Sequence, residues 1–472
     1  MQYLAITWCI TVLFAHSLYA STLMDKIESV IKKELPYATI SILVKDAKNG
    51  QLIVNKNTKK LLYPASTIKL FTATAALYHW QADHYFKTSL LKDKNNYYIR
   101  FGASPSLTSD NLSSLISDYF LQQRITQIKG SIVLDASIFS PPYHPAGISY
   151  DDLGWYYAAP DSAIILDENK ASFKMTSSKL NEPVTFYPVN AQSPLTVLNQ
   201  VITVNKNNRP PCTLNISNEK NNTVRLYGCA PLTEKPQLIE LAIPEPEHWA
   251  QAIIYNTLQK NNIQLKGSIR FAKTPDSAKH LVSLRSNSIH ELVNHMLKES
   301  DNLYADNLAK QLGYSLTKKA TNAEAVLAIK QILAKHMILD DNQLELADGV
   351  GTRYNLASTK QISVLLDTIY HDKKLFSLFI EALPQSGVSG TLKNRMKNTR
   401  LEKIIYAKTG TMHDISALSG FMINPNGRPL IFSIIINGIH QPIAKAKALE
   451  EQILSLIDEE VNTEMPEHSQ FA

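Results

Sequence analysis

One short segment near the N-terminus organises the interpretation of the chain, and it reads Tyr63-Pro64-Ala65-Ser66-Thr67-Ile68-Lys69-Leu70-Phe71. Pro64 and Ala65 are typical of the end of an extended segment, and the apolar and small residues of 67–77 predict a buried helix. Ser66 is then expected in the first turn, with Lys69 one turn later on the same face. This places a hydroxyl beside an amine, where unpaired backbone N–H groups and the helix dipole favour negative charge.

This pair of side chains suits nucleophilic catalysis. A serine hydroxyl is a weak nucleophile until a neighbouring base removes its proton, and a neutral lysine amine can be that base. The spacing alone is not specific, because Ser-x-x-Lys recurs at Ser89–Lys92, Ser217–Lys220 and Ser315–Lys318. The context of Ser66 differs, since a lysine in an otherwise apolar helix is costly to bury without a function. We therefore predict that Ser66 is an acylated nucleophile and that Lys69 is its base.

The composition limits the classes of protein to consider. A chain of 472 residues is long enough for two or three domains, and 19% charged residues are too few for a disordered protein. The net charge of +6 is mild, and no block of Lys and Arg predicts a nucleic-acid partner. This balance allows at most peripheral contact with an anionic polymer or membrane surface, and it does not indicate an oligomeric state.

The first twenty residues differ in kind from the rest. Residues 3–15 are almost all apolar and are followed by a polar stretch after Ala20, which is typical of a secretory signal peptide spanning 1–20. The apolar run is short for a permanent membrane anchor. One feature is atypical, because no Lys or Arg precedes the apolar run. We expect export to the periplasm.

Cysteine usage agrees with export. Cys9 lies in the predicted signal peptide, which leaves Cys212 and Cys229, and residues 213–217 and 223–227 between them alternate like the two strands of a hairpin. A disulfide closing this hairpin suits an oxidising compartment, and the alternative is two unpaired thiols. Because neither Cys-x-x-Cys nor paired histidines at ligand spacing occur, we expect no metal and no cofactor.

The remaining periodicity predicts one domain built from both ends of the chain, with a long β-rich insertion after the Ser66 helix. The predicted helices are 23–35, 247–259, a mostly helical block from 288 to 338, 359–371, 375–383 and 443–461. The predicted strands are 38–46, 51–55, 97–101, 130–135, 267–271, 404–408, 417–424 and 430–439. The last helix is acidic at its end, so we interpret it as a core helix and not as a membrane anchor.

Two later motifs complete a set with the Ser66 pair. Ser300-Asp301-Asn302 falls where one predicted helix ends and another begins, and Lys408-Thr409-Gly410-Thr411 is expected at the end of a strand. A second Ser-Asp-Asn, at 109–111, is interpreted as a turn in which Ser109 or Asp110 caps a helix. A serine-lysine pair followed by Ser-Asp-Asn and Lys-Thr-Gly is the signature set of penicillin-binding proteins and serine β-lactamases.

The chain resembles the D-alanyl-D-alanine carboxypeptidase/endopeptidase family, the low-molecular-mass class C penicillin-binding proteins of peptidase family S13. The segments that carry the resemblance are 64–69, 298–306, 382–392 and 407–411. It implies an α+β transpeptidase/β-lactamase-like fold, in which a five-stranded antiparallel sheet lies between helices and inserted β-rich domains split the sequence. The implied division is a catalytic domain of 21–82 plus 279–472, an inserted domain II of 83–171 plus 241–278, and an inserted domain III of 172–240.

Two segments depart from the family pattern. Asp348-Gly349-Val350-Gly351 has valine where the family usually has serine, and Gly102-Ala103-Ser104-Pro105 stands where Gly-Asp-Pro is common. Both lie outside the three motifs, so they bear on fine specificity more than on catalysis.

The resemblance also implies roles for the catalytic side chains. Ser66 forms the acyl-enzyme, and Lys69 must be neutral, which we expect burial and the charge of Lys408 to favour by lowering its pKa. Ser300 relays a proton towards the leaving amine. Asn302 holds the substrate amide and contacts Lys69.

Substrate binding is expected from the third motif and from two further positions. Lys408 and Thr409 attract the substrate carboxylate, Gly410 allows close approach of the ligand backbone, and the Thr411 N–H contributes to the oxyanion hole. Asp152 lies in a segment that resembles one reaching the family's cleft, where a carboxylate binds a diaminopimelate ammonium, and its alternative is a solvated loop acid. Arg353 follows the Asp348 segment and either clamps a carboxylate or forms a surface ion pair.

The sequence therefore predicts a periplasmic serine DD-peptidase that acts on peptidoglycan peptides as a carboxypeptidase, an endopeptidase or both, and that binds β-lactam antibiotics such as penicillin covalently. Two alternatives remain open. One is a serine β-lactamase, although no dedicated deacylating Glu motif is evident. The other is a non-catalytic wall-binding protein with a relic site, against which the intact motifs argue.

Overall fold

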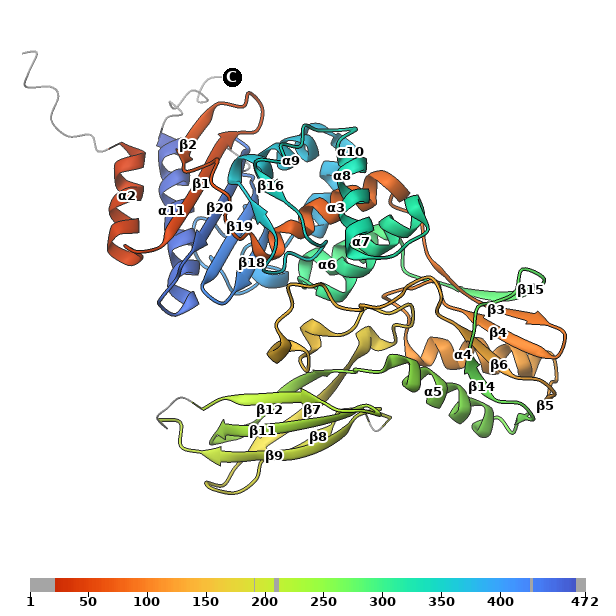
Figure 1. Cartoon of the computed structure of the whole chain (residues 1–472). Helices are drawn as coiled ribbons and strands as arrows, with labels where there is room; N and C mark the ends of the chain where they lie inside the picture. The colour runs from red at the N-terminus through yellow and green to blue at the C-terminus, as the bar shows by residue number, and fades with distance from the viewer. Residues whose placement is uncertain (1–21, 191, 208–211, 425–427, 464–472) are drawn as a thin grey trace, which may run out of the picture.

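The computed structural model describes residues 22–190, 192–207, 212–424 and 428–463 (Figure 1). The predicted signal peptide, 1–20, lies outside the described residues. Within the described part of the chain, no helix combines the length and the hydropathy needed to cross a bilayer.

Both ends of the chain meet in one five-stranded antiparallel sheet, as the sequence predicted. Its strand order is β18-β19-β20-β1-β2, with β1 at Thr39–Asp46, β2 at Leu52–Lys56, β18 at Ile405–Met412, β19 at Ile415–Met422 and β20 at Leu430–Asn437. All eight residues of β1 pair with β20. Every residue of β19 and β20 is buried, because helices cover both faces of the sheet.

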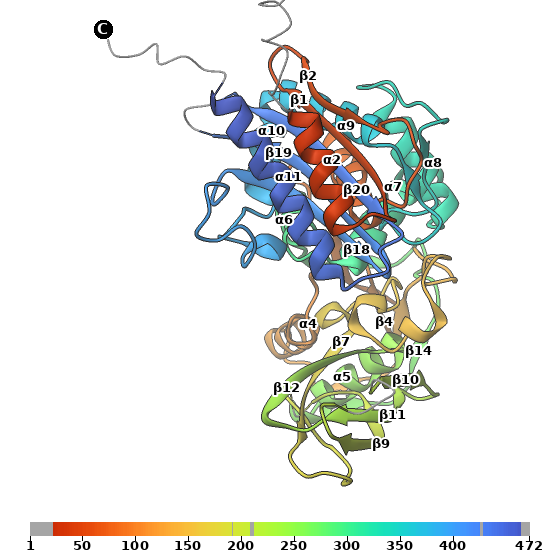
Figure 2. The same cartoon turned by 90° about the vertical axis from the view of Figure 1, so that its left-hand side faces the viewer.

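One face of this sheet is covered by the two terminal helices, α2 (Leu23–Glu34) and α11 (Ile443–Thr463), which lie side by side in Figure 2. Thr22 starts α2 with a capping box to Asp25. The opposite face packs against a helical layer made of α3 (Lys69–Trp80), α6 (Ile289–Lys298), α7 (Asn302–Thr317), α8 (Asn322–Leu333), α9 (Thr359–His371) and α10 (Lys373–Ala382). A short pair, β16 (Leu344–Glu345) and β17 (Leu356–Ala357), borders this layer.

The insertion between α3 and α6 forms the lower half of the molecule in Figure 1. Its first sheet has the order β14-β6-β4-β3-β15, with β3 at Lys87–Asp93, β4 at Asn96–Arg100, β6 at Ile132–Asp135, β14 at Ile269–Phe271 and β15 at Lys279–Arg285. The helices α4 (Ser109–Gln122) and α5 (Pro246–Lys260) accompany it, as does the pair β5 (Gln127–Ile128) and β13 (Gln264–Leu265). Because β15 pairs with β3, the segment 279–285 lies in the inserted sheet, whereas the sequence division assigned it to the catalytic domain.

Two three-stranded sheets complete the insertion, with orders β10-β11-β9 and β12-β7-β8. Their strands are β7 (Lys170–Ser177), β8 (Thr185–Pro188), β9 (Thr196–Val204), β10 (Leu214–Asn218), β11 (Thr223–Pro231) and β12 (Thr233–Ala242). One continuous hydrophobic cluster joins these sheets to β3, β4, α4 and α5. The start of α4 corrects a sequence-based interpretation, since the N-cap is Thr108, paired with Asn111, and not Ser109 or Asp110.

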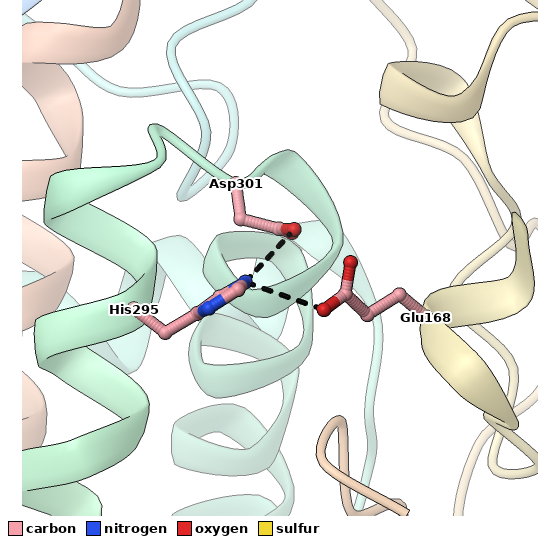
Figure 3. A group of neighbouring side chains, drawn as sticks. All are labelled: Glu168, His295 and Asp301. Carbon is pink, nitrogen blue, oxygen red and sulfur yellow. Dashed lines mark hydrogen bonds and ion pairs between the residues drawn. The ribbon is translucent and has the colours of Figure 1, made fainter. Parts of the chain in front are cut away.

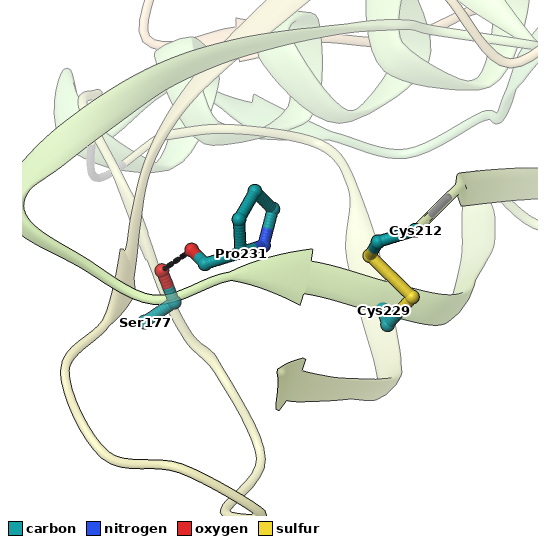
Figure 4. Close-up of a disulfide and its surroundings, with 4 residues drawn as sticks. All are labelled: Ser177, Cys212, Cys229 and Pro231. Atoms are coloured by element: carbon teal, nitrogen blue, oxygen red, sulfur yellow. Dashed lines mark hydrogen bonds between the residues drawn. A yellow bond between two sulfur atoms is a disulfide. The ribbon is translucent and has the colours of Figure 1, made fainter. Parts of the chain in front are cut away.

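The predicted hairpin is present and is closed by a disulfide between Cys212 and Cys229 (Figure 4). Gly228, at φ +96° within β11, allows the two segments to approach closely next to this bond, because a Cβ there would lie 2.2 Å from the Thr213 carbonyl oxygen. The Ser177 hydroxyl donates a hydrogen bond to the Pro231 carbonyl oxygen at 2.8 Å and thereby joins β7 to the end of β11.

Candidate active site

The proposed nucleophile lies in a tight 3₁₀ turn, η1 (Ala65–Ile68), and α3 begins only at Lys69. The sequence predicted a helix over 67–77 with Ser66 in its first turn, and in the structure that first turn is 3₁₀ and not α-helical. Ala65 has φ +48°, a conformation that costs a non-glycine residue roughly 1–3 kcal/mol and persists only where its surroundings fix it. Two glycines permit this close packing. A Cβ on Gly351 would lie 2.0 Å from the Ala65 carbonyl oxygen, and a Cβ on Gly410 would lie 2.7 Å from the Pro64 carbonyl oxygen.

Lys69 connects the first motif to the second. Its Nζ lies 2.7 Å from Ser66 Oγ and 2.7 Å from Asn302 Oδ1, and the side chain is completely buried. Burial lowers the pKa of Lys69 to about 7, against the opposing charges of Asp301 and Asp348. An appreciable fraction of this amine is therefore neutral at neutral pH and has a lone pair available to accept the Ser66 proton.

Lys408 makes the corresponding connection between the second and third motifs. Its Nζ lies 2.7 Å from Ser300 Oγ and 2.8 Å from the carbonyl oxygen of Thr409. Burial lowers the pKa of Lys408 well below its ordinary value, and the charge of Lys69 adds to this effect. The sequence-based expectation named burial and the charge of Lys408 as the causes of a lowered Lys69 pKa, and burial is the dominant cause in the structure.

The Lys-Thr-Gly-Thr segment lies within β18, which continues to Met412, and not at the end of a strand as the sequence suggested. Because β18 is the first strand in the sheet order, β19 pairs with one of its edges, and the other edge is bridged only at its start, where residues 405–407 bond to 384–386, and pairs with no strand from Lys408 onward among the described residues. The Thr409 side chain donates to Thr391 Oγ1 at 2.8 Å, and Thr411 is exposed. An edge strand of this kind leaves backbone N–H and C=O groups available to an extended peptide.

The Ser-Asp-Asn segment links α6 to α7, as predicted. Ser300 has φ +59°, and Asp301 caps α7 by accepting a hydrogen bond from the Tyr304 N–H at 2.9 Å. The strained backbone turns the Ser300 hydroxyl towards Lys408, while Asn302 reaches Lys69. The structure thus brings together five side chains that the sequence singled out for catalysis.

Asp152 contacts the motifs indirectly. It lies in the short turn η2 (Tyr150–Asp152), and its Oδ1 accepts a hydrogen bond from the Tyr157 hydroxyl at 2.9 Å. The Tyr157 carbonyl oxygen in turn accepts from Asn302 Nδ2 at 2.7 Å. Burial and Asp152 both raise the pKa of Tyr157, so this phenol remains a hydrogen-bond donor at neutral pH.

Arg353 lies on the surface next to the segment that precedes Asp152. Its side chain is exposed and takes part in none of the ion pairs found among the described residues. The neighbouring backbone is close to the insertion, because a Cβ at Gly147 would lie 2.9 Å from the Arg353 backbone nitrogen. The structure therefore gives no hydrogen bond between Arg353 and the motif residues.

Sequence reasoning missed the role of Asp348 in shaping the site. Its Oδ1 accepts hydrogen bonds from the backbone N–H groups of Val350 and Gly351, both at 2.8 Å. Thr72, on α3, donates to the Gly349 carbonyl oxygen at 2.7 Å and attaches this loop behind Lys69. The local pattern of an Asp before glycines indicated a turn, but its effect on the lysine charge depends on tertiary packing.

Sequence reasoning also missed a charged cluster behind the Ser-Asp-Asn segment, formed by Glu168, His295 and Asp301 (Figure 3). Each residue offers a ligand atom, and these atoms lie within 4.8 Å of one another. However, Lys170 Nζ lies 2.6 Å from Glu168 Oε2 and already supplies a cation, so we interpret the group as a charge network and not as a metal site. Its members come from separate segments with no recognisable spacing, which explains why the sequence did not reveal it.

Comparison with known proteins agrees with this geometry. A model of the D-Ala-D-Ala carboxypeptidase 3 (S13) family matches residues 23–459. The chain is 30% identical over 423 residues to a protein named D-alanyl-D-alanine carboxypeptidase DacB from Haemophilus influenzae, covering 87% of this chain and 88% of that protein.

Solved structures give the same result. The crystal structure of penicillin-binding protein 4 from Haemophilus influenzae matches with a TM-score of 0.82 and 29% identity, covering 91% of this chain and 99% of that one. A complex of that protein with a β-lactam matches with a TM-score of 0.77 and 27% identity, covering 92% of this chain and 99% of that one. On sequence and fold together, the chain belongs to the D-Ala-D-Ala carboxypeptidase 3 (S13) family.

Proposed function

We propose that this protein is a serine DD-peptidase that cleaves peptidoglycan stem peptides through an acyl-enzyme on Ser66. The observation that carries the proposal is the position of the buried Lys69 amine, 2.7 Å from both Ser66 Oγ and Asn302 Oδ1. A lysine with a pKa of about 7 in this position is matched to proton transfer at neutral pH. Family membership and the relatives' printed activities point to the same reaction.

The first half of the reaction uses the two serines and Lys69. Ser66 Oγ attacks the peptide carbonyl that precedes the terminal D-residue, and neutral Lys69 accepts the hydroxyl proton. The C–N bond of the tetrahedral intermediate then breaks, and the proton returns through Ser300 to the leaving amine. The backbone N–H groups of Ser66 and Thr411 stabilise the oxyanion, and losing one such donor typically costs about 3 kcal/mol.

The second half returns the enzyme to its starting state. Water attacks the ester carbonyl of the acyl-enzyme, one of its protons passes to Lys69, and the ester C–O bond to Ser66 breaks. Ser66 recovers its proton, and the shortened peptide leaves with a new carboxylate. Each cycle therefore consumes one water molecule and one peptide bond.

The third motif binds the peptide in this proposal. The substrate extends along the free edge of β18, where Gly410 lets its backbone approach, and its carboxylate lies against Lys408 and Thr409. A nearby carboxylate favours the charged form of Lys408 and offsets the effect of burial. At the outer end, Asp152 binds the ammonium of a diamino-acid side chain and Arg353 binds a carboxylate.

We place the protein outside the cytoplasm, in the periplasm, with residues 1–20 as its signal peptide. The Cys212–Cys229 disulfide supports an oxidising compartment. We also propose that β-lactams acylate Ser66, since a relative of known structure has been crystallised with a β-lactam.

Replacement of the nucleophile tests this proposal. Ser66→Ala is expected to lose both covalent labelling by fluorescent penicillin and release of D-alanine from a pentapeptide. Ser217→Ala, which alters another Ser-x-x-Lys in the β10 strand, is the matched control and keeps both activities. Labelling of the Ser66 variant at the wild-type rate would contradict the assignment.

Two further measurements separate the alternatives. A long-lived penicilloyl adduct in mass spectrometry excludes a β-lactamase, because that enzyme must deacylate quickly. Digestion of purified peptidoglycan then shows which bonds are cleaved. Loss of cross-linked dimers indicates endopeptidase activity, and loss of pentapeptide monomers alone indicates carboxypeptidase activity.

A further inference from the structure

The Ser-Asp-Asn segment lines a small cavity of about 190 Å³, and the other lining residues include Glu168, Lys170 and His295, to which the proposed mechanism gives no role. His295, on α6, lines this cavity, and Figure 3 shows its ring between Asp301 and Glu168. Its Nε2 is 3.4 Å from Asp301 Oδ2 and 3.5 Å from Glu168 Oε1. The first carboxylate belongs to the catalytic motif, and the second belongs to the insertion, in the turn η4 (Asp167–Asn169).

Two carboxylates that face one imidazole nitrogen require that nitrogen to carry a proton, since a lone pair there would be repelled. A positive charge on the ring is favoured further, because each carboxylate stabilises it. Burial alone would lower the pKa of His295, but the hydrogen bond and charge of Asp301, with the charges of Glu168 and Glu299, raise it above the ordinary value. The ring also packs on Tyr304, with centroids 4.2 Å apart.

Other ionisable groups face this network from every element around it. Lys170 Nζ lies 2.6 Å from Glu168 Oε2 and 3.6 Å from Glu240 Oε1, and it therefore neutralises the insertion side of the cavity. The ionisable groups around His295 are Glu299 from the C-cap of α6, Asp301 and Tyr304 from α7 and its cap, Glu168 and Lys170 from η4 and β7, Glu240 from β12, and Tyr156 and Tyr157 from η3 (Tyr156–Ala158).

Asp301 transmits the state of His295 to the catalytic side chains. Its Oδ1 caps α7, its backbone N–H donates to the Met296 carbonyl oxygen at 3.1 Å, and only its Oδ2 faces His295. The residues on either side are Ser300, in the strained left-handed conformation, and Asn302. A conformation of this kind persists only while its surroundings hold it.

We propose that protonated His295 is a positioning residue that clamps Asp301 to Glu168 and thereby holds Ser300 and Asn302 against the two active-site lysines. The clamp joins the insertion to the catalytic motif at a second point, beside the hydrogen bond from Asn302 to the Tyr157 carbonyl. When His295 loses its charge, its Nε2–H can still donate to a carboxylate, but the ring no longer neutralises the pair, so the clamp weakens and the segment loosens. The inference rests on the proposed function, because acylation of Ser66 is its readout.

The experiment compares full-length wild type with His295→Gln, which keeps a side-chain N–H donor but has no titratable charge. The second-order rate constant for acylation by fluorescent penicillin is measured from pH 5.5 to 9. Wild type is expected to be faster by about tenfold at pH 6, the order expected for one charge-assisted hydrogen bond. This ratio falls towards one as the pH rises through the pKa of His295, because only the charged ring neutralises the two carboxylates.

His248→Gln is the matched control, since His248 also pairs with a carboxylate, Glu245, at 2.9 Å, but lies exposed on α5. It is expected to follow the wild-type profile at every pH. A wild-type to His295→Gln ratio that stays constant with pH would show a merely structural role and overturn the inference. Absence of acylation in wild type itself would instead refute the proposed function.

A second measurement does not depend on the folding of the His295 variant. NMR titration of the wild-type histidine ring is expected to give His295 a pKa above 6.5, and Glu168→Gln is expected to lower it, because one of the two carboxylates loses its charge. A pKa at or below 6.5, or no response to Glu168→Gln, would contradict the clamp.

Discussion

Two lysines without access to solvent, Lys69 and Lys408, hydrogen-bond to the two ends of the same Ser-Asp-Asn segment. Each is buried by the same packing that positions it, so burial lowers both pKa values. The positive charge of one also disfavours that of the other. Both effects favour a neutral Lys69 that can take a proton, and an anionic substrate bound against Lys408 would restore the charge of that second lysine.

The pH dependence of acylation follows from Lys69. Because burial lowers its pKa to about 7, the neutral base becomes more abundant as the pH rises through that value, and the acylation rate rises with it. In Lys69→Arg the side chain stays protonated, so the rate should fall by about 10²–10⁴-fold and this acid limb should disappear. Stopped-flow measurement of the acylation rate between pH 5 and 9 tests both effects. If the variant showed the same rise of the rate with pH as wild type, Lys69 would be excluded as the base.

Gly410 supports the same chemistry through its lack of a side chain. A Cβ there would lie 2.7 Å from the Pro64 oxygen, 3.0 Å from the Ala65 Cβ and 3.2 Å from the Ser66 nitrogen. Gly410→Ala should therefore displace the η1 turn at a cost of about 1–3 kcal/mol and reduce acylation. The measurement is acylation rate beside thermal stability, and an unchanged rate would mean that β18 and η1 separate without consequence.

Among the helices, α7 joins the active site to a buried ionic cluster. Asn302 begins the helix, and two turns further Lys310 Nζ lies 2.7 Å from Asp306 Oδ2 and 3.4 Å from Asp161 Oδ2. The exposed fractions of these side chains are 1–4%. Burial raises the pKa of Asp161 to about 7, and the charge of Asp306 adds to the effect. The helix is therefore held to the insertion by a lysine that two carboxylates share.

Lys310→Met should destabilise the protein by about 3–5 kcal/mol, because it leaves two buried carboxylates without a cation. The loss of stability should increase as the pH rises. A carboxyl group whose pKa is raised in the folded state stabilises that state only while it is protonated, and it loses its proton as the pH rises. Lys330→Met is the control, as Lys330 pairs with Asp341, which is 81% exposed, and should change stability by about 0–1 kcal/mol. Urea unfolding at pH 6 and pH 8 measures both variants, and equal effects would contradict the argument.

The sequence predicted elements well where the signal is local. The helix predicted over 359–371 coincides with α9, and the two strands between Cys212 and Cys229 form the expected hairpin. Sequence-based prediction failed where segments distant in the chain determine the geometry. The 3₁₀ turn around Ser66 depends on packing against Gly351 and Gly410, and the pairing of β9 with β11 is parallel and joins segments that no turn connects. His295 was missed for the same reason, because its partners come from other elements.

At the scale of the whole molecule, the hydrophobic cores form two regions. Two clusters pack on the opposite faces of the main sheet, and a third lies wholly in the insertion, where it joins all of the larger inserted sheets. Separate cores of this kind usually unfold as separate units. The contacts between them include the polar ones of His295 and Lys310 and a small apolar cluster in which Phe139 and Ala163 of the insertion pack with Ala320. We therefore expect calorimetry to resolve two transitions.

Removal of the disulfide tests this division. Cys212 and Cys229 are 17 residues apart, and a loop of about this size contributes roughly 3 kcal/mol in the chain-entropy model. In the variant with both cysteines changed to serine, the midpoint temperature of the insertion's unfolding transition should fall by about 6–12 °C. The reason is that 1 kcal/mol shifts the midpoint of a unit of this size by about 2–4 °C. The transition of the catalytic part, and acylation of Ser66 at 25 °C, should remain as in wild type, since the bond lies in the β10-β11-β9 sheet and Ser66 lies beside β18. A single transition that shifts as one, together with slower acylation, would instead mean that the polar contacts between the two parts make them one cooperative unit.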